Sequence, residues 1–261
     1  MLRLLRDLRR HRDLLYMLTW RDISIKYRQS VMGFLWALLM PLLIVGAGVL
    51  VRVGLSTVSG RPVAPSQIAA VALKALPWSF FVASLRFGTT SLAANANLVT
   101  KIAFPRSVFP VSAVLSQLFD FLVASPVLIV LLAAGPGHLG IHVLWVPVLL
   151  GLLFVLTTGL ALLLSAANLF FRDVKYLVEV VLTFAIFFTP VFYDVEMFGR
   201  RGSLLMLNPV APILEGLRAS VIEDRPPSLD WTLYCAVVSV TLGFLAPTAF
   251  HRLEPKFAER I

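Results

Sequence analysis

Six long apolar stretches, separated by polar or turn-forming residues, organise this chain of 261 residues. Their boundaries are Met32–Val53, Ile68–Leu92, Val108–Ala134, Ile141–Ala167, Leu177–Tyr193 and Trp231–Phe250. Each approaches the ~20 apolar residues that a helix needs to cross the hydrocarbon core of a bilayer. Lipid offers no hydrogen bonds to the backbone, so we expect these stretches to be α-helices. The pattern predicts an all-α membrane protein with six transmembrane helices.

The first 31 residues follow a different pattern, in which leucines recur at helical spacing and arginines lie between them. The leucines are Leu4, Leu5, Leu8, Leu15 and Leu18, and the arginines are Arg3, Arg6, Arg9, Arg10 and Arg12. A basic amphipathic helix of this kind lies in the plane of the membrane surface. Its charge also anchors the topology, and the two interpretations are compatible. The segment is too charged for a signal peptide, so we expect it to be retained.

Residues 194–230 form the longest segment between two predicted spans. Within it, Asn208 and Pro209 precede an amphipathic stretch, 210–222, that is too short to cross a bilayer. Asparagine is favoured before a helix and proline at its first position. We therefore predict a short interfacial or re-entrant helix before the last span.

The composition indicates one membrane domain over residues 1–261. Hydrophobic residues make up 59% of the chain and charged residues 14%, which leaves too little polar surface for a water-soluble body. Fifteen of the 23 Lys and Arg residues fall in segments 1–31, 93–107, 168–176 and 251–261, and six fall in the segments of the opposite side. Because cytoplasmic loops carry the excess of Lys and Arg, both termini are predicted to be cytoplasmic. The net charge of +9 then reflects these loops and anionic lipid rather than nucleic acid.

This topology divides the chain into five consecutive parts. They are a cytoplasmic amphipathic helix at 1–31, spans one to five at 32–193, an outer loop at 194–230, span six at 231–250 and a cytoplasmic tail at 251–261. No polar segment approaches the ~100 residues of a typical soluble domain. We therefore expect no separate soluble domain in this chain.

The sequence lacks the motifs of common catalytic sites. It contains no Gly-Lys pair, and so no phosphate-binding loop, and it has neither His-Glu-x-x-His nor Gly-x-Ser-x-Gly. Cys235 is the only cysteine, and the histidines fall at loops or span edges with no evident carboxylate or thiol cluster beside them; they are His11, His138, His142 and His251. We predict no catalytic residue, no metal site and no cofactor on this chain. ATP and Mg²⁺, if they drive transport here, must be bound by another polypeptide.

Charged and aromatic side chains within the predicted spans are candidates for a substrate path. Arg86 is costly in lipid, so it either contacts a substrate, pairs with a carboxylate such as Asp120, or snorkels to the interface. Lys74 lies nearer the outer face and is expected to snorkel. Aromatic rings either stack on sugar rings or face lipid; they are Trp78, Phe80, Phe81, Phe184, Phe187, Phe188, Phe192 and Tyr193.

Two short cytoplasmic loops combine apolar and cationic residues. The first covers Asn95–Arg106 and the second covers Asn168–Tyr176. Apolar side chains on such a loop need a cover, which is either a cytoplasmic partner or the packing of the hairpin on itself.

Five stretches, in this order, resemble the membrane permease of ATP-driven polysaccharide exporters, the family that exports O-antigen, capsule and teichoic acid. They are Arg21–Pro41; Pro77–Phe81 followed by Asn95–Val99; Phe104–Ser112; Asn168–Tyr176 leading to Thr189–Tyr193; and Asn208–Arg218. The resemblance covers most of the chain from Arg21 to Arg218. It implies a multi-pass protein of the cytoplasmic (inner) membrane that forms a homodimer and binds two copies of an ATP-binding subunit.

The resemblance also implies roles for individual residues. Contact with the ATPase would fall to Asn95, Asn97, Lys101, Phe104, Pro105, Arg106, Phe171, Arg172, Asp173 and Lys175. A path for a lipid-linked polysaccharide would be lined by Trp78, Phe80, Phe81, Arg86, Phe187, Phe188 and Tyr193. An outer gate would contain Asn208, Pro209, Pro212, Glu215 and Arg218.

Three other functions compete with this one. A related permease could export a drug or another lipid. An intramembrane transferase acting on lipid-linked sugars would need clustered acidic or histidine residues, whereas the acids here are dispersed along the sequence. A membrane scaffold without transport would have no need of the ordered loop motifs.

Overall fold

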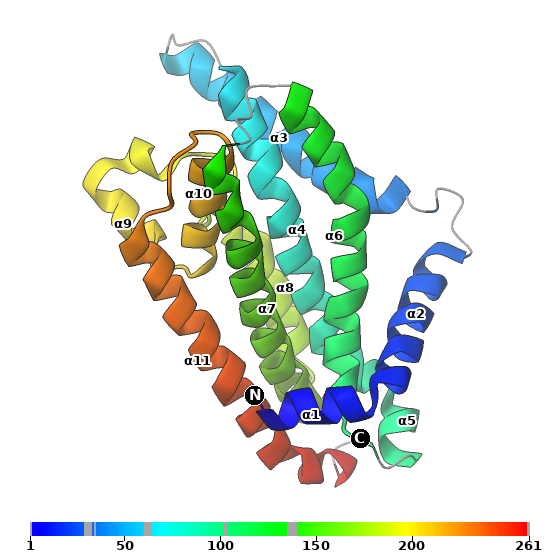
Figure 1. Cartoon of the computed structure of the whole chain (residues 1–261). Coiled ribbons are helices and arrows are strands. Elements are labelled where there is room, and N and C mark those ends of the chain that lie inside the picture. The colour runs from blue at the N-terminus through cyan, green and yellow to red at the C-terminus, as the bar shows by residue number, and fades with distance from the viewer. Residues whose placement is uncertain are drawn as a thin grey trace.

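The computed structural model describes residues 2–28, 33, 35–59, 64–101, 104–134 and 140–259. All regular structure in these ranges is helical (Figure 1). The α-helices are α1 (Leu2–Arg10), α2 (Arg12–Arg28), α3 (Leu35–Ser59), α4 (Pro65–Ala94), α5 (Ala96–Lys101), α6 (Val108–Ala134), α7 (Trp145–Phe170), α8 (Val174–Ala185), α9 (Gly202–Leu205), α10 (Val210–Val221) and α11 (Leu229–Leu253). Three 3-10 segments, η1 (Ile141–Leu144), η2 (Val195–Arg201) and η3 (Glu254–Glu259), join or extend them. The prediction of an all-α fold is confirmed for the described residues.

Four helices in the described ranges are long and apolar enough to cross a membrane, and they correspond to predicted spans two, three, four and six. They run over Pro65–Ala94, Val108–Val130, Ile141–Phe170 and Leu229–Phe257. The chain is therefore a multi-pass membrane protein. The first predicted span lies on α3, whose described apolar part, Pro41–Gly54, is shorter than a bilayer crossing.

The prediction of one continuous helix over Leu177–Tyr193 is wrong. Helix α8 ends at Ala185, and turns and bends follow up to Tyr193. Twelve helical residues extend only about 18 Å, whereas the hydrocarbon core is about 30 Å thick. The interruption has a local cause, because Pro190 lacks an N–H group and disfavours helical geometry at Thr189.

Helix α4 lies at the centre of the bundle, where it packs against α6 and α7, and α7 packs in turn against α11 (Figure 1). A small residue permits the close approach of α4 and α7: a Cβ atom added at Gly88 would lie 2.8 Å from the Cβ of Ala161. The main core then gathers buried side chains of α4 and α7 with those of α10, among them Trp78, Leu153 and Leu214.

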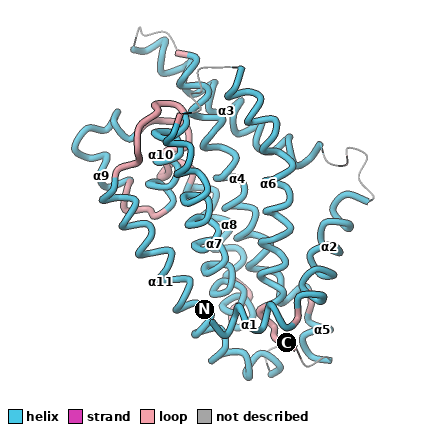
Figure 2. The backbone as a smooth tube through the Cα atoms, in the orientation of Figure 1, coloured by secondary structure: helices cyan, strands magenta, loops and turns pink. Residues whose placement is uncertain are grey.

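Both termini lie at the same end of the bundle, together with α1 and α5, while α9 and α10 lie at the opposite end (Figures 1 and 2). At the first end, which we call the inner end, Leu4 of α1 joins a second apolar cluster that includes Phe109, Phe250 and Phe257. This arrangement agrees with the predicted topology, in which both termini share one side; that this side is cytoplasmic stays a prediction.

The amphipathic N-terminal segment is two helices rather than one. Helices α1 and α2 meet at a turn at His11, and α2 packs along α6. In α1 the side chain of Leu4 is buried, whereas Arg6, Arg9 and Arg10 are exposed, as the amphipathic pattern predicts. Residues 29–31 of the predicted interface segment, and Met32 at the start of the first predicted span, lie outside the described residues.

The predicted short helix of the outer loop is confirmed as α10, which occupies the opposite, outer end. Its backbone N–H at Val210 donates to the side-chain oxygen of Asn208 over 3.2 Å. Pro209 sits at the boundary position with a helical φ of −63°, so its missing N–H costs the helix nothing. Helix α10 packs against α7, α4 and α11, and none of its residues is exposed, so it is anchored in the bundle.

Candidate functional site

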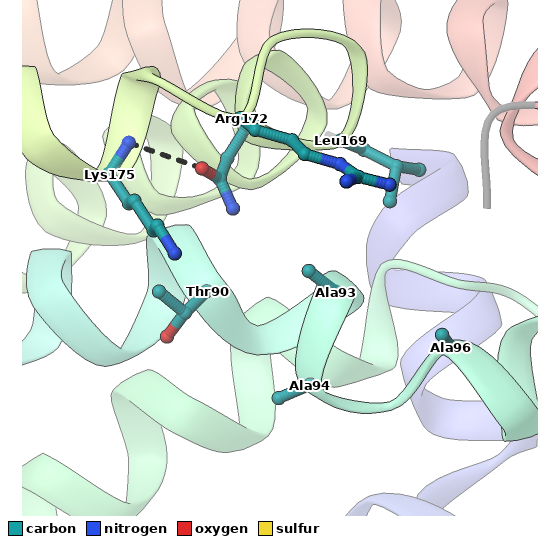
Figure 3. A pocket seen from close by; sticks show the side chains of 8 residues that line it. Thr90, Ala93, Ala94, Ala96, Leu169, Arg172 and Lys175 are labelled. Carbon is teal, nitrogen blue, oxygen red and sulfur yellow. Dashed lines mark hydrogen bonds between the residues drawn. The ribbon is translucent and has the colours of Figure 1, made fainter.

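At the inner end, the end of α4 and the start of α5 lie beside the turn between α7 and α8, and together they form a pocket of about 440 Å³. Of the ten predicted coupling residues, Arg172 and Lys175 line this pocket. Its lining consists of Thr90, Ala93, Ala94, Ala96, Asn168, Leu169, Arg172 and Lys175 (Figure 3). Small side chains from the end of α4 and the start of α5 leave the space open, and the cations Arg172 and Lys175 border it from the other loop. The arrangement offers a positively charged recess to an acidic or apolar partner segment.

Asn168 fixes the geometry of the second loop. Its buried side-chain oxygen accepts a hydrogen bond from the backbone N–H of Lys175 over 3.1 Å, the dashed line in Figure 3. The first-turn N–H groups of a helix lack partners within the helix, so this contact satisfies one of them at the start of α8. The link holds the end of α7 to the start of α8 across the turn that carries Phe171, Arg172 and Asp173.

The remaining predicted coupling residues divide into exposed and anchored ones. Phe171, Asp173 and Asn97 are exposed, with Phe171 reaching 70%. Asn95 instead donates from its side chain to the carbonyl of Ser91, and Phe104 packs on Phe109. Pro105 is half-buried beside them, and the side chain of Lys101 lies outside the described residues.

Arg106 serves the fold of the inner end. Its backbone N–H donates to a carboxylate oxygen of Glu254 over 2.7 Å, and its guanidinium donates to the backbone carbonyl of Glu254. The loop before α6 is thereby tied to the C-terminal segment η3. Because its guanidinium is already engaged within the chain, Arg106 is less available to a partner than the exposed Arg172.

A second pocket, of about 420 Å³, contains three of the seven predicted path residues, Trp78, Phe80 and Arg86. Its polar lining also includes Lys26, Gln117 and Asp120. Of the other predicted path residues, Phe81 packs against Trp78 in the core, and Tyr193 donates from its hydroxyl to the carbonyl of Phe187. Phe187 and Phe188 are exposed on the surface beyond α8 and do not line this pocket.

Arg86 forms an ion pair, which was one of its three predicted alternatives, but its partner is not the candidate Asp120. Arg86 binds Glu179 of α8 over 2.7 Å, and Asp120 instead contacts Lys26 and Tyr27 of α2. Helix α8 packs on α4, so Arg86 of α4 lies beside α8. Helix α2 packs on α6, so Asp120 of α6 lies beside α2. The sequence offered no signal for Lys26, because it stands in a segment expected to lie on the membrane surface.

The prediction that Lys74 snorkels is also wrong. Its side chain is completely buried and binds Glu215 over 3.1 Å, Asp194 over 3.4 Å and the carbonyl of Tyr193 over 2.8 Å. Arg52, also buried, binds both carboxylate oxygens of Asp194 over 2.9 and 3.0 Å. The acids that are dispersed in the sequence thus gather in space at the outer end.

Lys74, Arg52, Asp194 and Glu215 form what we call the outer charge cluster. Arg218 of α10 extends this cluster towards solvent. It binds Glu215 and Glu223, each over 2.8 Å, and Glu196 over 3.2 Å. Burial disfavours the charged form of Asp194, but Lys74, Arg52 and Arg218 outweigh it and lower the pKa of that carboxyl. Each acid of the cluster therefore faces a cation, which is the arrangement of a structural network rather than of a general acid or base.

Of the predicted gate residues, Glu215 and Arg218 belong to the outer charge cluster and Asn208 caps α10. Asn208 also donates to the hydroxyl of Thr189 over 2.8 Å, which ties α10 to the turn after α8. Pro212 is buried within α10, and Pro209 is half-buried.

Two histidines have carboxylate neighbours that the sequence did not reveal. His142 lies 3.1 Å from Asp224, and His251 lies 3.0 Å from Glu254. Among the described residues no group of three or more His, Cys, Asp or Glu is placed to hold a metal ion.

Comparison with known proteins gives consistent results. The sequence profile of the family described as ABC-2 type transporter matches residues 13–222. The O-antigen export system permease protein RfbA of Myxococcus xanthus is 34% identical over 264 residues, which cover 100% of this chain and 100% of that protein. Two O-antigen export system permease proteins RfbA of Klebsiella pneumoniae are 27% and 26% identical, and each alignment covers 95% of this chain and 94% of the relative.

Proposed function

The chain belongs to the ABC-2 type transporter family, and we propose that it is the membrane subunit of an exporter that moves a lipid-linked, O-antigen-like polysaccharide across the cytoplasmic membrane. As a membrane subunit of such a transporter it is not an enzyme. ATP and Mg²⁺ are bound by a separate subunit, two copies of which act on a homodimer of this chain.

The observation that carries this proposal is the inner-end pocket. Two segments that are about 70 residues apart in the sequence, the end of α4 with Ala96 and the turn after α7, build a single recess bordered by Arg172 and Lys175. Exposed Phe171 stands beside it. An ATP-binding subunit that inserts a segment here would push directly on the ends of α4 and α7, the two most central helices.

The exposed apolar face of α8 supports the homodimer. Among its exposed side chains are Leu177, Val180, Val181 and Phe184, followed by Phe187 and Phe188 after the helix ends. A 12-residue helix followed by turns is too short to cross a bilayer alone. A second copy of the chain on this face would cover its exposed apolar side chains.

The pocket that contains Trp78, Phe80 and Arg86 supports a path for the glycan. It combines aromatic side chains with the polar groups of Lys26, Gln117 and Asp120. Sugars present apolar C–H faces and hydroxyl groups, so a lining of this composition suits a sliding chain. The outer charge cluster and α10 would then form the gate at the exit, and both termini would be cytoplasmic.

The test is reconstitution with an ABC-type ATP-binding subunit, sought among the genes that neighbour the one for this chain. We expect the two proteins to co-purify at equal stoichiometry, and vesicles that contain both to consume ATP and move a lipid-linked glycan. Transport of other lipids or of drugs, with the glycan left behind, would support a different ABC permease. A folded, monodisperse chain that never retains an ATPase would refute the proposal.

A charge reversal locates the contact. Arg172→Glu should weaken capture of the ATPase about tenfold or more, since opposing like charges at an interface costs several kcal/mol. Arg200→Glu is the matched control, because it makes the same change at an exposed position of the outer end. Equal loss in both variants would show a general effect of net charge and would remove the recess from the contact.

A further inference from the structure

Lys74 is the charged residue at the centre of the outer charge cluster. It belongs to α4, and its ammonium group contacts the carbonyl of Tyr193 and the carboxylates of Asp194 and Glu215. These acceptors come from two separate parts of the chain, the turn before η2 and the helix α10. One ammonium group therefore ties α4 to both elements that cover the outer end, which we call the outer cover.

This contact is directional in a way that apolar packing is not. Removing an ammonium group from water is expensive, and the cost is offset only while suitably placed carboxylates surround it. Leucines that slide past one another keep most of their contacts, whereas Lys74 loses its partners when α10 or Asp194 moves away. The outer end is thus restricted to arrangements in which each of these charges keeps an opposite charge.

Helix α4 also reaches the inner-end pocket. Sixteen residues separate Lys74 from Thr90, which corresponds to about 24 Å along the helix. Between them α4 is largely buried and packs closely on α7 at Gly88. A displacement applied to Thr90, Ala93 or Ala94 therefore reaches Lys74 through one continuous helix.

We propose that Lys74 is a positioning residue through which α4 moves the outer cover: a shift of α4 at the inner-end pocket displaces the ammonium group and carries Asp194 and Glu215 with it. The inference rests on the proposed function and adds a route by which ATP-driven closure at the inner end opens the outer end. Lys74 itself need not contact the glycan.

The remaining cations make such a movement feasible. Asp194 retains Arg52, and Glu215 retains Arg218 over 2.8 Å, so neither carboxylate is left alone when Lys74 shifts. The outer elements can therefore follow Lys74 without leaving either acid unpaired.

The experiment measures glycan transported per ATP hydrolysed in the reconstituted complex. Lys74→Met keeps the length of the side chain and removes the charge. We expect ATP hydrolysis to stay within about twofold of wild type and transport to fall about tenfold or more, as for the loss of a single interaction that assists a rate-limiting step. Lys74→Arg keeps the charge and should retain most of the transport.

Two further variants separate positioning from stability. Leu156→Ala makes a cavity in the buried core of α7, and a destabilised bundle should lower hydrolysis and transport together. Lys74→Glu combined with Glu215→Lys restores one opposite-charge pair and should recover transport relative to Lys74→Glu alone. If Lys74→Met fails to fold, this exchanged pair still tests the proposal.

The outcomes distinguish the two levels of the argument. Wild-type protein that neither binds the ATPase nor transports would refute the proposed function. Wild-type transport together with normal transport per ATP in Lys74→Met, or a loss that Leu156→Ala reproduces in the same ratio, would overturn the role of Lys74 and leave the proposed function intact.

Discussion

The C-terminal segment η3 closes the inner end of the bundle, and Phe257 is the residue that does so. Its side chain is 0% exposed, with ring centroids 5.2 Å from Phe250 and 5.9 Å from Phe170. The two neighbours belong to α11 and α7, so one ring joins η3 to two membrane-spanning helices. We predict that Phe257→Ala destabilises the whole inner end.

The expected magnitude follows from burial. Truncating a buried Phe to Ala costs about 3–5 kcal/mol, and the two edge-to-face ring pairs fall within that loss. In a chain of this size the unfolding midpoint should fall by about 6–20 °C. The loss should be large because Leu4, Phe109 and Leu169 share the same cluster and cannot all move into the space.

Thermal unfolding of the purified protein in one detergent provides the assay, and hydrogen exchange of residues 104–110 locates the effect. Phe257→Leu is the control, since it keeps most of the apolar volume and should cost less than half as much. A change in unfolding free energy below about 0.5 kcal/mol for Phe257→Ala, the size typical of exposed positions, would refute the claim that the segment is part of the core.

Three further predictions follow from contacts described above. Gly88→Ala should lower the free energy of unfolding by about 1–3 kcal/mol, because the new methyl group meets Ala161. Gly151→Ala in α7 is the control and should not destabilise the protein, because a Cβ atom there would have no neighbour within 4 Å. Thermal unfolding compares the two variants, and equal values would contradict the close contact at Gly88. Asn168→Ala should cost about 1 kcal/mol and raise hydrogen exchange at Lys175, while Asn168→Asp should not. Because the pKa of Asp194 is lower in the fold than its ordinary value of 3.8, its stabilising effect is complete above that value and is lost as pH falls below it. Asp194 should therefore cause no change in the unfolding midpoint between about pH 8 and 5. Asp194→Asn should lower stability at neutral pH and reduce the loss of stability in acid. A loss of stability near pH 6 that Asp194→Asn abolishes would contradict this prediction.

The sequence predicted those features that depend on local pattern. Long apolar stretches identified α4, α6, α7 and α11, and the Asn208-Pro209 pair identified the start of α10. Helix α8 was predicted too long because its apolar composition continues past Pro190, and composition alone does not register a single backbone interruption.

The charge pairs could not be predicted in the same way, since their partners are distant in sequence. Lys74 contacts Asp194 and Glu215, which lie 120 and 141 residues further along the chain. From the sequence alone, an isolated lysine near the end of a span is predicted to snorkel to the membrane surface. Arg86 had acidic candidates on several helices, and only the packing of α8 on α4 selects Glu179. The aromatic residues were recognised as a group, but their division between core, pocket and surface depends on helix rotation.

The location of the two termini sets which gene fusions this fold permits. Helix α1 and the segment η3 occupy the same end of the bundle, and η3 contacts α5 (Figure 1). With the proposed topology, two copies of the chain joined tail to head would need only a polar linker, with no added segment to cross the bilayer. Such a tandem protein would let a substitution be placed in one half alone, so that the contribution of each half of the proposed dimer could be measured separately.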